Sequence, residues 1–254
     1  MTYFAIMNGY TTMSLFTLPI GFKYGGYVFS PIILALACFV ETFAAVRLIQ
    51  AARVAEIYSY TDLVEYSLGK TYKYIFQVFV ALLHFGYSLA MLGFFARACQ
   101  KIVAKAYETA SGTEIEVSLW IYAAVTLVVF APITWVRTLE VFQYGNVYSI
   151  IVVYLMIITI TVFCAMHITE NNSEPGPGWE AFNNKEFVTM CGLAFFQYEG
   201  IGTLLPVMEA SSARDSMIFL TIASLVTLFC SHVAFSEMIY YSYGHDLNEP
   251  IVIF

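Results

Sequence analysis

Charged residues are scarce in this chain of 254 residues: only 11% are Asp, Glu, Lys or Arg, whereas about 25% is usual in a soluble domain. This scarcity excludes a water-soluble globule, because too few charged side chains remain to cover its surface. The 60% hydrophobic content and the mean hydropathy of +0.74 also exclude intrinsic disorder. The composition therefore predicts an all-α integral membrane protein, in which runs of about 20 apolar residues cross the lipid bilayer.

Basic residues and chemical motifs are also few. Eleven Lys and Arg face 18 acids and form no basic stripe, so a nucleic-acid partner is not expected. The five cysteines are odd in number and widely spaced, which is neither a disulfide framework nor a metal site. Neither a nucleotide fingerprint nor a zinc or hydrolase motif occurs. We therefore expect no enzyme activity, no metal and no cofactor.

Hydrophobic runs are what the chain has in abundance. Hydropathy predicts seven spans, at about 3–22, 27–50, 74–99, 118–136, 145–168, 187–207 and 217–243. The first span contains Gly9 and Pro19, and the sixth contains Gly200, Gly202 and Pro206. These residues predict that both spans are helices broken near the middle of the membrane.

The position of the two broken spans suggests a function. They are five spans apart, and broken helices at corresponding places in two halves of a chain indicate an inverted-repeat transporter. The alternative is a pair of Gly/Pro kinks without a site, because both residues are common in membrane helices. A broken helix frees backbone groups that lipid cannot satisfy, so either interpretation requires protein or a wet cavity around the breaks.

Several segments, in order along the chain, resemble one family. They are Phe16–Gly26 (FTLPIGFKYGG), Asp62–Gly69 (DLVEYSLG), Ile133–Leu139 (ITWVRTL), Phe195–Pro206 (FFQYEGIGTLLP) and Tyr243–Asp246 (YGHD) followed by Ile251–Ile253 (IVI). Together they resemble the amino acid/auxin permease family, and most closely its proton-coupled amino acid transporter branch. The resemblance implies a leucine-transporter-type fold with two five-helix inverted repeats and usually eleven helices.

The resemblance also implies how the chain is organised. Residues 1–254 would form a single membrane domain that ends before the last helices of the family. Residues 1–168 would be the first five-helix repeat, 169–186 an acidic loop, and 187–254 the start of the second repeat. The missing helices would leave the first and sixth spans partly uncovered, so we expect other membrane protein subunits as partners.

The resemblance places a substrate site at the two breaks. Its residues would be Thr12, Met13, Ser14, Gln197, Glu199, Gly200 and Gly202. The family usually has Gly-x-Gly where this chain has Thr12-Met13-Ser14, and the added side chains should crowd the pocket. Glu199, beside the sixth-span break, is the candidate proton-coupling group. Its alternative role is to cap the loose amides of the broken helix.

Other polar residues fall inside the predicted spans. Glu41 lies near the middle of the second span, where a carboxylate costs about 2.5–3.5 kcal/mol. It is either a proton site or the acceptor of a structural contact between helices or subunits. His84, His232 and Glu237 also lie inside predicted spans, and the histidines are either members of a proton relay or hydrogen-bonded residues of the core. His232 and Glu237 are five residues apart and do not share a helix face.

Three basic residues lie at the end of the third span. Arg97, Lys101 and Lys105 recur every four residues, so they lie on one helix face and are expected to meet lipid headgroups.

Two functions follow from these observations. One is an active proton-coupled amino acid transporter, or half of a split one, moving an amino acid together with a proton. The other is a degenerate relative that acts as a structural accessory subunit of a larger membrane complex, such as a respiratory assembly in the mitochondrial inner membrane. The lost Gly-x-Gly, the missing helices and Glu41 make the accessory subunit the working interpretation.

Overall fold

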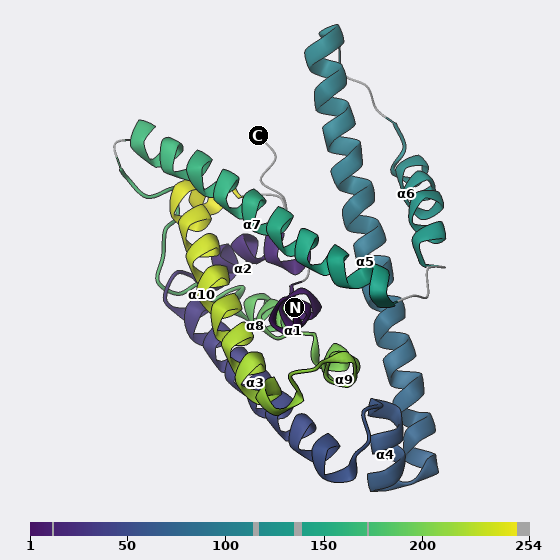
Figure 1. Cartoon of the computed structure of the whole chain (residues 1–254). Coiled ribbons are helices and arrows are strands. Elements are labelled where there is room, and N and C mark those ends of the chain that lie inside the picture. The colour runs from purple at the N-terminus through teal and green to yellow at the C-terminus, as the bar shows by residue number, and fades with distance from the viewer. Residues whose placement is uncertain (12, 114–116, 135–138, 172, 248–254) are drawn as a thin grey trace. The chain divides into compact units, whose positions relative to one another are not determined.

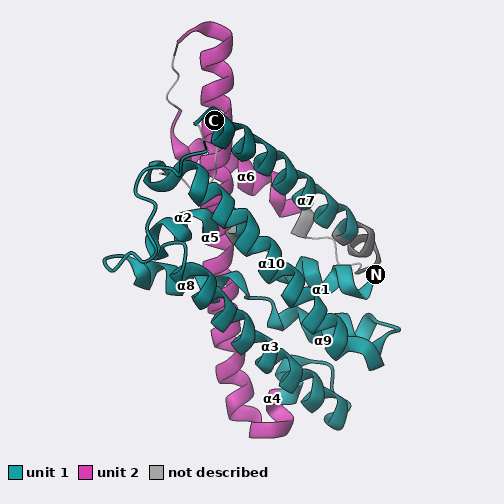
Figure 2. Cartoon of the chain, turned by 90° about the vertical axis from the view of Figure 1, so that its left-hand side faces the viewer, with its two compact units in different colours: residues 1–63, 140–254 teal, residues 64–139 magenta. Residues whose placement is uncertain are grey.

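The computed structural model describes residues 1–11, 13–113, 117–134, 139–171 and 173–247, and throughout these residues the regular structure is helical (Figure 1). The prediction of an all-α membrane protein is confirmed. The chain divides into two compact units, residues 1–63 with 140–254 and residues 64–139 (Figure 2). The division of the chain into repeats stays a prediction.

The larger unit contains both broken spans. Its helices are α1 (Thr2–Tyr10), α2 (Leu18–Gly25), α3 (Phe29–Ala55), α7 (Leu139–Glu170, without its first residue), α8 (Phe187–Gln197), α9 (Ile201–Ala210) and α10 (Met217–Tyr243), with short 3₁₀ turns at Met13–Phe16, Arg214–Ser216 and Gly244–Asp246. The first span is divided into α1 and α2, and the sixth into α8 and α9. Pro19 lies in the first turn of α2, where a missing backbone N–H costs nothing.

The two broken helices lie side by side in this unit. α2 packs against α8, α1 packs against α9, and α3 and α10 pack against members of both pairs. Close approach requires small residues: a Cβ atom at Gly21 would lie 2.7 Å from Sδ of Met190, across the contact between α2 and α8. The core of the unit therefore surrounds the broken helices.

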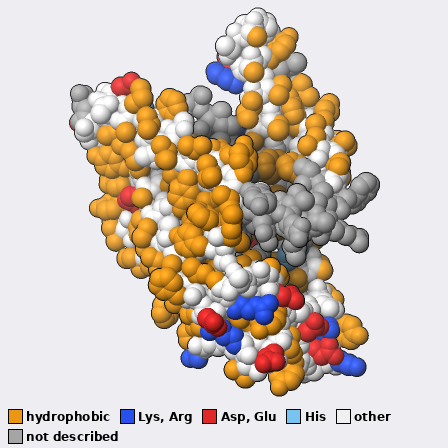
Figure 3. All heavy atoms as spheres, in the orientation of Figure 1, with side chains coloured by type: hydrophobic (Ala, Val, Ile, Leu, Met, Phe, Trp, Pro, Cys, Tyr) orange, Lys and Arg blue, Asp and Glu red, His pale blue; other side chains and the backbone are white. Residues whose placement is uncertain are grey.

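The outer surface of this unit is apolar. Hydrophobic side chains cover most of its visible face in Figure 3. Among the exposed large side chains are Phe39 and Phe43 of α3, Phe163 of α7 and Val226 of α10. Such a surface is stable only against lipid or other protein.

Four of the described helical segments are long and apolar enough to cross a membrane: Phe29–Ala55, Lys70–Ser111, Val147–Glu170 and Arg214–Asp246. A shorter apolar helix covers Leu119–Pro132. Together with the two broken spans, these segments account for all seven spans that hydropathy predicts.

The smaller unit is built around one long helix. It consists of α5 (Lys70–Ser111), against which α6 (Leu119–Thr134) packs, and of most of α4 (Tyr60–Leu68). Gly69 and Gly112, both with positive φ, flank α5, and the helix extends twelve residues beyond the predicted span, which ends at residue 99. Polar helix-forming residues continue the helix after the apolar run stops.

A loop closes one end of the larger unit. The loop after α7 lies against the turn between α2 and α3, where the backbone N–H of Val28 donates to the carbonyl of Ala181 (3.1 Å). The indole of Trp179 stacks on the ring of Tyr27, with centroids 4.7 Å apart. Gly26 makes this turn possible, since its φ is +87° and a Cβ there would lie 2.6 Å from the backbone of Ala181.

Candidate functional site

The two breaks meet where α1 crosses the gap between α8 and α9. A Cβ atom at Gly200 would lie 2.5 Å from the ring of Tyr10 and 2.8 Å from the carbonyl oxygen of Gly9. Gly200 is buried, and its φ of −149° is outside the left-handed region that favours glycine. Glycine is therefore required at this position by the close approach of α1 to the segment between α8 and α9.

The backbone around the breaks is partly paired by local turns. The N–H of Glu199 donates to the carbonyl of Phe196 (3.3 Å), and that of Thr203 donates to Gly200 (3.0 Å). At the other break the N–H of Thr11 donates to Met7 (2.7 Å). These tight turns end α8 and α1 within the apolar part of the protein, as the glycines of the sequence predict.

Glu41 is connected to the first break. The hydroxyl of Tyr10 donates a 2.8 Å hydrogen bond to Oε1 of Glu41, which joins the end of α1 to the middle of α3. Tyr10 is fully buried. The carboxyl group of Glu41 also interacts electrostatically with that of Glu199. Glu41 thus makes an interhelical hydrogen bond within this chain, beside the second break.

Glu199 occupies the break itself. It stands in the non-helical segment between α8 and α9, and it is half-buried between the buried residues Tyr198 and Gly200. Its role as the proton-coupling group stays a prediction.

A second polar contact joins the end of α8 to α10. Nε2 of Gln197 and Nε2 of His232 are 3.3 Å apart, and both side chains are at most 1% exposed. Within the described part of the chain, Oε1 of Gln197 and Nδ1 of His232 have no hydrogen-bond partner. A buried polar atom without a partner costs about 1–3 kcal/mol, so this pair is suited to receive a polar group of a ligand or a water molecule.

The other predicted site residues lie in different places. Gly202 is on α9, and a Cβ there would meet nothing within 4 Å. Thr12 lies outside the described residues, as do the side chains of Met13 and Ser14, so the predicted crowding at the first break stays a prediction. Glu237 lines a surface groove together with Trp179, whereas His232 is in the core.

Four predicted residues belong to the smaller unit. His84 is on α5, and its Nδ1 lies 2.8 Å from the carbonyl oxygen of Val80, one turn earlier in the same helix. Arg97, Lys101 and Lys105 follow one another on α5, and Lys105 pairs with Glu108 at 3.1 Å. From the predicted set, the structure therefore gathers around the breaks Glu41, Gln197, Glu199, Gly200 and His232.

Sequence reasoning did not identify Tyr10 as a member of this site. A tyrosine in an apolar span has no distinctive local signal. Its importance appears only when the hydroxyl meets Glu41 and the ring meets Gly200. No group of three or more His, Cys, Asp or Glu residues in the described part of the chain is arranged to hold a metal ion.

A helical membrane bundle in which two broken helices cross is the architecture of a membrane transporter. The family model described as "Transmembrane amino acid transporter protein" matches residues 1–253. The chain belongs to this family, which is one of transporters rather than enzymes. The resemblance seen in the sequence is thereby confirmed.

Two curated relatives have the name "Vacuolar amino acid transporter 3". The one from Schizosaccharomyces pombe is 21% identical over 251 residues, which are 98% of this chain and 37% of the relative. The one from Saccharomyces cerevisiae is 21% identical over 253 residues, 98% of this chain and 35% of the relative. The chain thus spans little more than a third of their length. No solved structure matches it.

Proposed function

We propose that this chain forms the substrate-binding core of a proton-coupled amino acid transporter. The contact of Gly200 with Tyr10 and Gly9 carries the proposal, because it brings the two broken helices together at one place. Broken helices expose backbone N–H and C=O groups, which bind the charged ends of an amino acid. Membership of a transporter family supports the same conclusion.

The proposed roles follow from the positions of the side chains. Backbone amides at the first break, around residues 11–15, hold the substrate carboxylate. Glu199, in the second break, carries the coupled proton. Gln197 and His232 present unpaired polar atoms beside that break and fix a polar group of the substrate or of a bound water.

The electrostatic contact between Glu41 and Glu199 supports proton coupling. Two carboxyl groups in a low-dielectric region repel each other when both are ionised, so uptake of one proton relieves the repulsion. The carboxylate of Glu41 has a hydrogen-bond donor in the hydroxyl of Tyr10. Tyr10 thereby joins the end of α1 to the Glu41 carboxyl group.

The membrane in which this activity takes place is also a proposal. The two named relatives are vacuolar, which supports a vacuolar location for this protein. No comparison supports the mitochondrial inner membrane that we considered for an accessory subunit.

The accessory-subunit interpretation is the alternative. Its sequence argument at Thr12-Met13-Ser14 stands, because the structure does not describe those side chains. Its argument from Glu41 is weaker, because the carboxylate meets Tyr10 of the same chain and needs no neighbouring subunit. Neither the fold nor the family match provides support for a structural role in a larger complex.

Transport by the purified full chain in proteoliposomes tests the proposal. With an imposed pH gradient, the vesicles should accumulate a small neutral amino acid, and Glu199→Gln should abolish the accumulation. Glu209→Gln is the matched control, because Glu209 is an exposed acid at the end of α9. A thermal unfolding transition shows that the reconstituted protein is folded. Uptake by such protein that equals the uptake of empty vesicles would contradict the proposal and favour the accessory subunit.

A further inference from the structure

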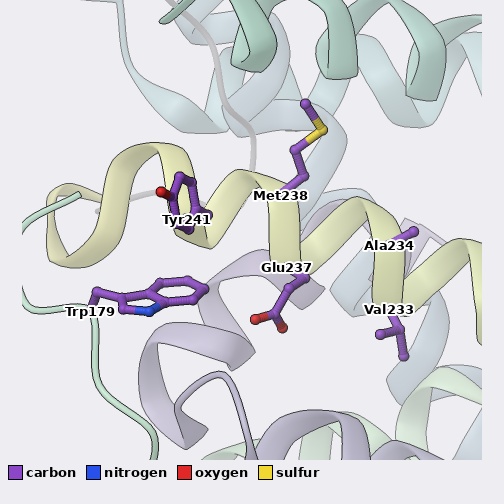
Figure 4. A pocket seen from close by; sticks show the side chains of 6 residues that line it. All are labelled: Trp179, Val233, Ala234, Glu237, Met238 and Tyr241. Atoms are coloured by element: carbon purple, nitrogen blue, oxygen red, sulfur yellow. The ribbon is translucent and has the colours of Figure 1, made fainter. Parts of the chain in front are cut away.

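A groove on α10 lies outside the proposed transport site. It has a volume of about 390 Å³ and is lined by Trp179, Val233, Ala234, Glu237, Met238 and Tyr241. Figure 4 shows that Trp179 reaches it from the loop after α7, whereas the other five side chains come from α10. The wall of the groove is apolar except at Glu237.

Glu237 is the acidic residue of this groove. Its Oε2 atom is buried and has no hydrogen-bond partner in the described part of the chain. No Lys, Arg or His is among the lining residues. An ionised carboxyl group in apolar surroundings is unfavourable, so it either takes up a proton or is accompanied by a cation. Glu237 is thus an acidic group at the groove that has a buried oxygen without a partner among the described residues and could take a cation.

Aromatic faces border the same space. The indole of Trp179 is fixed between Tyr27, on which it stacks, and Tyr240, with ring centroids 4.9 Å apart. It also meets the ring of Tyr241 edge to face at 5.1 Å. Aromatic rings attract organic cations through their negative faces, and quaternary ammonium groups are bound in this way. Because Tyr27 and Tyr240 cover the faces of the indole, the ring of Tyr241 is the one left for such a contact, and Trp179 contributes apolar area beside it.

The groove lies near one end of its helix. Glu237 is six residues before Tyr243, the last residue of α10, or about 9 Å along the helix axis. Trp179 belongs to the loop that follows α7 and is outside the predicted spans. Trp and Tyr typically occupy the level of lipid headgroups. The groove therefore opens where the ammonium groups of bilayer lipids are found.

We propose that this groove binds the ammonium headgroup of a bilayer lipid, such as a phosphatidylethanolamine or phosphatidylcholine. The Glu237 carboxylate pairs with the ammonium charge, the rings of Trp179 and Tyr241 contact its methyl or methylene groups, and the apolar wall formed by Val233 and Met238 contacts the adjoining chain. This assignment is independent of the transport function.

Native mass spectrometry tests the assignment directly. The full chain is reconstituted into nanodiscs of equal parts phosphatidylethanolamine, phosphatidylcholine and phosphatidylglycerol, and the lipids that remain bound are counted. The protein should retain the ammonium lipids about tenfold over phosphatidylglycerol, as expected for a combined ion-pair and cation–π contact. Glu237→Gln should abolish the preference, whereas Glu209→Gln should keep it. Equal retention of all three lipids by the wild type would overturn the proposal.

A second variant and a second ligand complete the test. Trp179→Leu removes the indole beside Tyr241 and leaves the carboxylate, so it should weaken the preference even if Glu237→Gln does not fold. Binding of octylammonium is measured in nanodiscs that contain only phosphatidylglycerol, to ask whether a soluble amine binds when no ammonium lipid is present. Octanol is the neutral control. Competition by octylammonium for retained ammonium lipid in mixed nanodiscs supports the proposal. Binding of octylammonium without any lipid preference would overturn the lipid as the occupant.

Discussion

The hydroxyl of Tyr10 donates a 2.8 Å hydrogen bond to Oε1 of Glu41. The ring of Tyr10 lies against Gly200, so that a Cβ atom there would be only 2.5 Å from it. One residue thus contacts α3 through its hydroxyl and the α8–α9 break through its ring. The geometry of the two breaks depends on where Tyr10 is held.

Removal of the Tyr10 hydroxyl should destabilise the protein. Tyr10→Phe leaves Glu41 without its donor in a partly buried position, and we expect a loss of about 1–3 kcal/mol in the free energy of unfolding. Glu41→Gln keeps an acceptor oxygen and should be tolerated better than Glu41→Leu. Denaturation in mixed detergent measures each change.

A matched variant on the same helix checks this prediction. Tyr3, also on α1, donates to Thr227 in an exposed hydrogen bond of 2.9 Å. Tyr3→Phe should therefore change stability much less than Tyr10→Phe. Equal effects of the two variants would show that the contact with Glu41 has no special importance.

The crossing of the breaks makes a prediction about two glycines. Gly200→Ala places a methyl group against Tyr10 and the backbone carbonyl of Gly9, so it should lower both the thermal transition and amino acid uptake. Such overpacking typically costs about 1–3 kcal/mol. Gly192→Ala, in α8, meets nothing within 4 Å and should be neutral or slightly stabilising. Equal stability of the two variants would argue against the close crossing.

The contact between Gln197 and His232 can be tested by a double-mutant cycle. Gln197→Leu or His232→Leu alone removes the hydrogen bond and leaves the other polar side chain buried, which should cost about 1–3 kcal/mol. The double variant should cost less than the sum of the two, since no polar atom of the pair remains. Strictly additive losses would show that the two side chains do not interact.

The loop after α7 should loosen when Gly26 is changed. Gly26→Ala combines a positive φ with a clash against Ala181, whereas Gly69→Ala has the positive φ alone. Trypsin should therefore cleave after the exposed Lys185 faster in Gly26→Ala than in the wild type. Cleavage in Gly69→Ala should be unchanged. Faster cleavage in both variants would show that the contact between Gly26 and Ala181 is not the cause.

Local signals in the sequence predicted the broken helices well. Glycine and proline act on the backbone where they stand, so Pro19 and Gly200 indicated the breaks without knowledge of the fold. The apolar runs likewise predicted the spans. The helix α5 is longer than the predicted third span, because hydropathy follows the apolar side chains, whereas α5 continues through Lys101, Lys105 and Glu108.

The contacts of the site could not be predicted in the same way. Tyr10 and Glu41 are 31 positions apart, and Gln197 and His232 are 35 apart. The sequence identified Glu41 and His232 as unusual, because polar side chains in apolar spans need partners, and Gln197 came from the family resemblance. Which residues become those partners depends on how the helices cross, and that information is spread over the whole core.

The length of α5 has a practical consequence. Its 42 residues extend for about 63 Å, roughly twice the thickness of a hydrocarbon core. One part of the helix must therefore stand in the aqueous phase as a stiff rod. A probe attached near its polar end would report rotations of the smaller unit faithfully, because a continuous helix transmits angular motion that a flexible tether would average out.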